Sequence, residues 1–185
     1  PHWHASIAKN TSHHLAEGDI LVNLDCDNFT GFRGGKYLLD TFTNKNIQAV
    51  HQFCKEEWFS GNYGRMAVRS EVFNDLGGYD ESFHNMGYQD TDLLERIKLE
   101  YPDGLLEDSN KDYNKAIAND KDKSIENVPK DIKEKGFLWM NGENEKKSKE
   151  NIKNQITIAN EGIYGIREDI RFYNPVNNSF ARLCT

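Results

Sequence analysis

The chain has 185 residues and a formal net charge of −7, with 30 acidic and 23 basic side chains. This length is sufficient for one domain with its own core, and the acidity argues against a protein that binds the phosphate backbone of nucleic acid. No apolar run approaches the roughly 20 residues that a membrane-spanning helix requires.

The first predicted elements are a helix over 6–18, which Gly18 would close, and a short buried strand over 19–25. The strand holds three consecutive apolar residues and ends at the acids Asp25 and Asp27. Acids at the carboxyl end of a buried strand lie where open α/β sheets bind their ligands.

Alternating helices and strands are also expected up to residue 100. The apolar spacing and the glycine stops predict a helix from 33–42, a strand within 48–53, a strand over 66–68, a short helix over 70–76 and a helix over 90–100.

The composition changes after residue 100, because Lys, Asp, Asn and Glu dominate over 101–135. We interpret this region as a polar insertion without a core. A polar helix over 144–155 and a closing strand or hairpin over 162–173 would follow. The predicted organisation is thus a core over 1–100 and a polar, partly helical extension over 101–185.

The three cysteines are widely spaced and form neither a CxxC pair nor a zinc pattern. Free thiols are typical of reducing compartments. We therefore expect a protein of the cytoplasm, either free or peripherally bound to a membrane.

The Asp25-Cys26-Asp27 triplet is a candidate metal site. On an extended segment, both carboxylates would point to the same side. Two hard oxygen ligands suit Mg²⁺ or Mn²⁺ when a substrate diphosphate supplies further ligands. The alternative is a strand end whose two acids solvate a turn.

Asp90 and Asp92 are candidates for acid–base chemistry at the start of the last predicted helix of the core. A carboxylate at a helix start within a cleft can deprotonate a hydroxyl group. The alternative is that both acids only complement the positive N-terminal end of the helix dipole.

The order of the motifs resembles that of family 2-like glycosyltransferases with the GT-A fold. Their pattern runs A-R/K-N, A-x-G-D, D-x-D at a strand end, R-x-x-x-F-x-x-x-G-G-F/Y-D-E, and an acidic pair before D-L-x-x-R. The matches in this chain are Lys9-Asn10, Ala16-Glu17-Gly18-Asp19, Asp25-Cys26-Asp27, Arg69 with Phe73, Gly77-Gly78-Tyr79-Asp80-Glu81, Gln89-Asp90, and Asp92-Leu93 with Arg96. The resemblance covers about residues 5–100.

This resemblance implies an α/β fold of the GT-A type, which is Rossmann-related and typical of nucleotide-diphospho-sugar transferases. Asp27 would hold Mn²⁺ or Mg²⁺, and Asp25 would contact the metal or the donor sugar. Asp90 would be the base that activates the acceptor hydroxyl group. Further expected contacts with the donor come from Lys9 and Asn10 near the nucleotide and from Gly61 and Asn62 around the sugar.

The implied reaction moves a sugar, with inversion, from a UDP- or GDP-type donor to a glycan, protein or lipid acceptor. Two alternatives remain: a non-catalytic remnant that binds a nucleotide sugar or a glycan, and a metal-dependent nucleotidyl or phosphoryl transferase.

Two departures from the family pattern bear on this interpretation. Gln89 stands where the family has Glu or Asp, which removes a like charge beside Asp90. The family also has a strand, a nucleotide-reading loop and a βα unit before A-R/K-N. We therefore expect that the base-reading half lies outside this chain, is supplied elsewhere or is absent.

Overall fold

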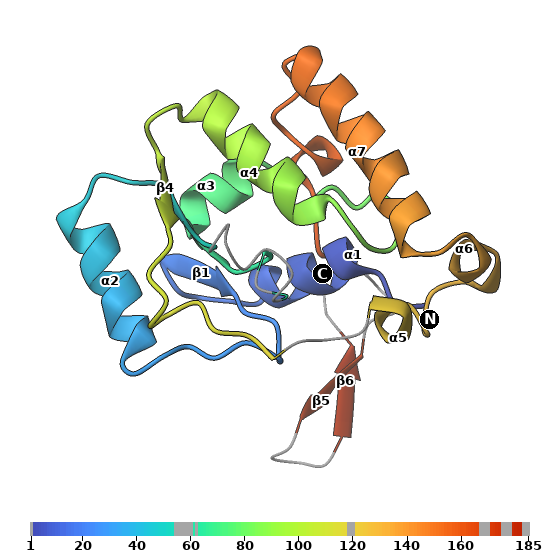
Figure 1. Ribbon diagram of the computed structural model, residues 1–185, viewed down its shortest axis with the longest axis horizontal. Coiled ribbons are helices and arrows are strands. Elements are labelled where there is room, and N and C mark those ends of the chain that lie inside the picture. Colours follow the sequence, from blue (N-terminus) through green and yellow to red (C-terminus); the bar gives the residue numbers. More distant parts are fainter. Residues whose placement is uncertain are drawn as a thin grey trace.

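The computed structural model describes residues 2–53, 61, 63–117, 121–166, 171–174 and 179–182; for 121, 122, 171–174 and 179–182 only the backbone is described. The elements, shown in Figure 1, are α1 (Ala5–His14), β1 (Ile20–Asn23), α2 (Gly34–Asn44), β2 (Ala49–Gln52), β3 (Met66–Arg69), α3 (Ser70–Asp75), α4 (Gln89–Glu100), β4 (Leu105–Asp108), α5 (Lys121–Ser124), α6 (Lys130–Lys135), α7 (Phe137–Lys153), the 3₁₀ turn η2 (Asn160–Gly162), β5 (Arg171–Asn174) and β6 (Ser179–Arg182).

Four strands form a mixed, open sheet in the order β1-β3-β2-β4. β3 runs antiparallel to both β1 and β2, whereas β2 and β4 are parallel. Consequently β1, β2 and β4 end at the same edge of the sheet, where β3 begins. We call this edge the carboxyl edge.

Side chains on the two faces of the sheet belong to two different cores, because successive residues of a strand point to opposite sides. Ala49, Met66 and Val68 pack with apolar side chains of α3 and α4. Val50 and Ala67, on the opposite face, pack with Leu38 and Phe42 of α2 and with Ile47. The sheet is therefore covered by α3 and α4 on one face and by α2 on the other (Figure 1).

These observations confirm an α/β protein, and each helix and strand expected before residue 101 is present. The predicted extent of the first helix is wrong, because α1 ends at His14. Leu15, which follows the helix, is 46% exposed.

Residues beyond 100 contribute to the core, so the prediction of a polar insertion without a core is wrong. Leu105–Asp108 forms β4 and pairs with β2, so the sheet continues past residue 100. Ile125, Val128 and Met140 form a third apolar cluster with Met86, and Tyr164 packs into the core between the sheet and α3 and α4.

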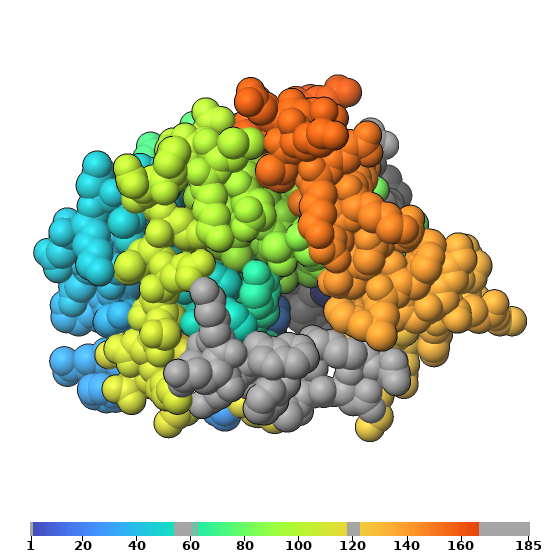
Figure 2. Space-filling model, turned by 45° about the horizontal axis from the view of Figure 1, so that its top comes forward, coloured from blue at the N-terminus to red at the C-terminus, as the bar shows by residue number. Residues whose placement is uncertain are grey.

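Helix α7 confirms the predicted polar helix and begins earlier than expected. It packs against α4 and α6, as Figures 1 and 2 show. The backbone of β5 and β6 forms an antiparallel hairpin within the predicted closing region and beyond it. In the described part of the chain, no helix has the length and apolar character needed to cross a membrane.

Candidate functional site

Asp90 lies in the first turn of α4, where the helix dipole favours a negative charge. Its Oδ1 accepts a hydrogen bond from Lys9 Nζ of α1 at 2.7 Å. The Lys9 and Asp90 side chains are only 13% and 15% exposed. This ion pair joins two residues that are 81 positions apart, and it identifies Asp90 as the centre of the candidate site.

Gly64 packs directly against the other oxygen of this carboxylate. A Cβ atom added to Gly64 would lie 2.8 Å from Asp90 Oδ2. The Gly64 carbonyl is held by the Asn23 side chain at the end of β1, which donates a hydrogen bond of 2.6 Å. The close approach of Gly64 to Asp90 therefore needs a residue without a side chain at position 64.

Tyr79 lies beneath the ion pair and is fully buried. Lys9 Nζ is 5.2 Å from the centre of its ring. The hydroxyl group is close to the Asp90 carboxylate, but it makes no hydrogen bond of standard geometry with the described residues. Burial, followed by the charges of Asp90 and Asp25, raises the pKa of Tyr79 well above its ordinary value. The hydroxyl group thus keeps its proton beside the Asp90 carboxylate.

The loop between α3 and α4 is held by three asparagine side chains from distant parts of the chain. Asn10 of α1 exchanges two hydrogen bonds of 2.8 Å with the backbone of Tyr79 and donates a third to Glu81. Asn160 donates hydrogen bonds of 2.7 Å to the carbonyls of Gly77 and Tyr79.

The third, Asn144 of α7, binds the part of the loop that leads into α4. Its Oδ1 accepts from His84 N at 2.7 Å, and its Nδ2 donates to Gly87 O at 2.7 Å. Because the side chain is 2% exposed, these bonds form away from solvent.

The two glycines of the Gly-Gly-Tyr-Asp-Glu motif have positive φ angles of 68° and 67°. A Cβ on Gly77 would lie 2.1 Å from the Ala159 carbonyl oxygen. Arg96, fully buried, donates to the carbonyls of Leu76 and Gly78 and forms an ion pair with Asp92 at 2.8 Å. These motif residues therefore position Tyr79 and α4, and Asp92 acts as the partner of Arg96.

The acids Asp25 and Asp27 follow β1 at the carboxyl edge. The prediction that they lie on an extended segment is wrong, because residues 25–28 form a turn in which Asn28 N donates to Asp25 O at 2.9 Å. The strand ends at Asn23, two residues before Asp25, so pairing with β3 no longer holds the chain extended there. Asp25 is exposed and Asp27 is half-buried.

The donor chemistry of this turn fits a hard divalent cation. Mg²⁺ is bound in proteins by one or two carboxylates together with water and substrate phosphates, and Asp25 and Asp27 provide two carboxylates. Within the described residues, no group of three or more His, Cys, Asp or Glu side chains could hold a metal ion. A cation at this turn would therefore depend on ligands from a bound substrate.

Contacts in the structure join predicted site residues in two groups, one at Asp90 and one at the Asp25–Asn28 turn. Lys9 contacts Asp90. Gly61 lies beside the Asp25–Asn28 turn, since its carbonyl accepts a hydrogen bond from Asn28 at 3.5 Å. Asn10 is fully buried, with both amide hydrogens bonded within the protein, so its predicted contact with a nucleotide gains no support. Asn62 lies outside the described residues.

Gly64, Tyr79 and Asn144 were not among the predicted site residues. The first two occur within motifs that the sequence displays, namely the segment before β3 and Gly-Gly-Tyr-Asp-Glu. Gly64 and Tyr79 come close to Asp90 because α4 packs against the sheet. The spacing of these residues in the sequence could not predict this contact. Asn144 lies in a polar helix and carries no local signal that distinguishes it from its neighbours.

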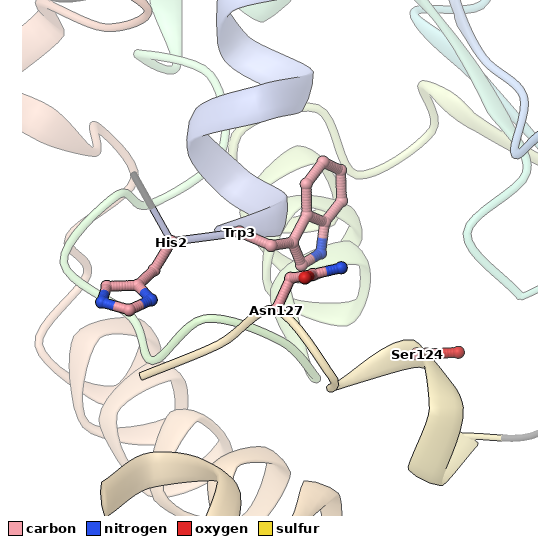
Figure 3. A pocket seen from close by; sticks show the side chains of 4 residues that line it. All are labelled: His2, Trp3, Ser124 and Asn127. Carbon is pink, nitrogen blue, oxygen red and sulfur yellow. The ribbon is translucent and has the colours of Figure 1, made fainter. Parts of the chain in front are cut away.

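Two cavities among the described residues are not lined by any predicted site residue. A cavity of about 420 Å³ lies among His2, Trp3, Ser124 and Asn127; Figure 3 shows Asn127 beside Trp3, with His2 and Ser124 further apart. A second, of about 70 Å³, lies beside His51.

Comparisons with protein-family models, with curated proteins and with solved structures find no match to this chain.

Proposed function

We propose that this chain belongs to an inverting, metal-dependent glycosyltransferase of the GT-A fold, which transfers a sugar from a UDP- or GDP-type donor to a hydroxyl group of a glycan, protein or lipid. The observation that carries the proposal is the largely buried ion pair of Lys9 and Asp90 over the Tyr79 ring. It brings together residues from three of the motifs that resemble the family.

Asp90 is the proposed general base. It removes the proton of the acceptor hydroxyl group as the new bond to the anomeric carbon forms. A single base that assists attack on the face opposite to the leaving group predicts inversion. The close approach of Gly64 restricts the position of the carboxylate, as a general base requires.

Asp27 and Asp25 are the proposed ligands of Mn²⁺ or Mg²⁺. When bound, the ion would neutralise the negative charge that develops on the departing diphosphate. The two carboxylates would hold this ion, and the exposure of Asp25 leaves access from solvent.

The proposal can be tested without knowledge of the acceptor. A panel of UDP- and GDP-sugars is incubated with Mn²⁺ and the protein, and the slow release of free nucleotide is measured. We expect release with at least one donor, and we expect Asp90→Asn to lower its rate by roughly 100-fold or more. Asp40→Asn, which changes an exposed carboxylate of α2, serves as the matched control.

Unchanged turnover in Asp90→Asn would remove Asp90 from the mechanism. A non-catalytic module that binds a nucleotide sugar or a glycan is the alternative. The ion pair that engages Asp90 favours this alternative, because a base in contact with an ammonium group is not available to a substrate. Binding of a donor without any release of nucleotide would support it.

A further inference from the structure

The cavity of about 420 Å³ near the start of the chain has the make-up of a small-molecule site. Trp3 lines it together with three polar side chains, those of His2, Ser124 and Asn127 (Figure 3). Its volume lies within the roughly 300–1,000 Å³ that ligand sites occupy. Trp3 is 44% exposed, whereas tryptophan is highly buried on average. A large part of the indole ring is therefore open to a ligand.

The backbone of Trp3 is held by hydrogen bonds on both sides. Trp3 N donates to Asn127 O at 2.9 Å, and Asn85 Nδ2 donates to Trp3 O at 2.6 Å. Two residues further on, Ala5 N donates to Asn85 O at 2.8 Å, and Ala5 is buried. The exposed indole ring is thus presented by a segment that is fixed to the rest of the protein.

The other wall of the cavity, which carries Ser124 and Asn127, is anchored in the same way. Ile125 and Val128 are each 4% exposed and belong to the third apolar cluster, with Met140 of α7. Ser124 remains half-buried and Asn127 exposed at the surface above them. Because both walls are fixed before a ligand arrives, binding requires little ordering of the protein.

We propose that this cavity binds an uncharged sugar unit of a glycan. A pyranose ring has a face of C–H groups and a rim of hydroxyl groups, so it requires a flat aromatic surface bordered by hydrogen-bonding groups. Trp3 provides the surface, since the face of its ring carries partial negative charge that attracts C–H hydrogens. Asn127 offers an amide with two donors and an acceptor, and Ser124 and His2 add a hydroxyl group and ring nitrogens.

A nucleotide fits this cavity less well than a sugar. A nucleobase can also stack on an aromatic ring and bond to an asparagine amide, but its phosphates require basic side chains. None of the four lining residues is Lys or Arg, and none is Asp or Glu. The cavity therefore favours a ligand without charge.

This inference goes beyond the proposed function and does not rest on it. The cavity shares no lining residue with the Lys9–Asp90 pair or with the Asp25–Asn28 turn. A glycan bound here would occupy a second site, whether or not the chain transfers a sugar.

NMR titration of the full 185-residue chain, labelled with ¹⁵N, tests the site. The chain has three tryptophans, and the indole N–H signal of Trp3 is identified by its loss in Trp3→Phe. The probes are the uncharged disaccharides cellobiose, maltose, lactose and N,N′-diacetylchitobiose, with uridine and adenosine as bases that carry no phosphate. The affinity of each variant is measured from the backbone amides that shift together with the Trp3 indole in the wild type.

We expect at least one disaccharide to shift the Trp3 indole signal to saturation. Trp3→Ala should weaken its binding by roughly fivefold or more, the lower end of what an aromatic stacking surface contributes, and Trp3→Phe should retain most of the affinity. Asn127→Ala should weaken binding by roughly threefold or more. Phe32→Ala, which removes another exposed ring, is the matched control and should bind as the wild type does.

Three results would overturn the glycan site. The Trp3 signal could stay unchanged with all four disaccharides. Uridine or adenosine could bind at Trp3 where no disaccharide does, which would make this a nucleobase site. Sugar binding could be equally strong in Trp3→Ala, which would place the sugar elsewhere on the protein. None of these results bears on the proposed function, which is tested through Asp90 and donor turnover.

Discussion

Tyr79 illustrates how a single side chain can carry an energetic cost at the site. A buried polar group without a hydrogen bond costs about 1–3 kcal/mol. The Tyr79 hydroxyl group makes no hydrogen bond of standard geometry with the described residues, although the Asp90 carboxylate lies close to it. Phenylalanine would fill the same space without a polar group, so a hydroxyl group beside the proposed base calls for an explanation.

Gly64 offers a direct test of how precisely the carboxylate of Asp90 must lie. Its φ angle is outside the positive range, so alanine is compatible with the backbone, but the new Cβ would be 2.8 Å from Asp90 Oδ2. We expect Gly64→Ala to displace the carboxylate and to lower donor turnover by roughly 10- to 100-fold. The free energy of unfolding should change by less than about 1 kcal/mol.

Turnover and thermal unfolding of Gly64→Ala are compared with those of Gly142→Ala, since no described atom lies within 4 Å of a Cβ at position 142. Normal turnover in Gly64→Ala would show that catalysis does not depend on the position that the Asp90 carboxylate has in this structure.

At the scale of elements, helix α7 holds the loop that carries the chain into α4. Asn144 makes this connection through hydrogen bonds to His84 and Gly87. We expect Asn144→Ala to lower the free energy of unfolding by about 2–3 kcal/mol, because the loop groups lose buried partners. Urea unfolding measures this change.

Hydrogen exchange should also become faster at the amides of His84 and its neighbours, whereas the amides of the sheet should exchange at rates set by global stability. Asn44→Ala, at an exposed position at the end of α2, is the matched control. Unchanged exchange in the loop would mean that other contacts hold it.

The elements differ in how far the sequence alone predicts them. β2 and β3 are short and largely apolar, so their pattern identifies them. β4 has only two apolar residues, and it is a strand because its backbone pairs with β2. The third apolar cluster was missed for a similar reason, since Ile125, Val128 and Met140 are scattered through polar sequence and meet only after folding.

At the scale of the whole molecule, the sheet topology determines which predicted residues come together. The parallel strands β1, β2 and β4 end at the carboxyl edge, and the antiparallel strand β3 begins there. This arrangement explains why the Asp25–Asn28 turn and Gly64 are near Asp90. Both acidic motifs are visible in the sequence, but the Lys9–Asp90 pair spans 81 positions and depends on how α1 packs against the rest of the fold.

The packing of α1 also makes global stability depend on pH. The centre of the His13 ring lies 4.8 Å from that of Phe73 and 6.3 Å from that of Tyr79. Burial, helped by the charge of Lys9, lowers the pKa of His13 from 6.5 to about 4. Between these values the unfolded chain binds a proton that the folded protein does not, so stability falls as the pH decreases from 6.5 to 4.

We expect His13 to contribute about 2 kcal/mol to this loss, less than the full shift implies because the ring is only partly buried. The free energy of unfolding in urea, measured at pH 7, 5.5 and 4, should fall less steeply for His13→Gln than for the wild type. His14→Gln, which changes an exposed neighbour on the same helix, should follow the wild type. Equal slopes for His13→Gln and the wild type would show that the His13 ring is protonated in the folded protein and that α1 does not exclude the charge.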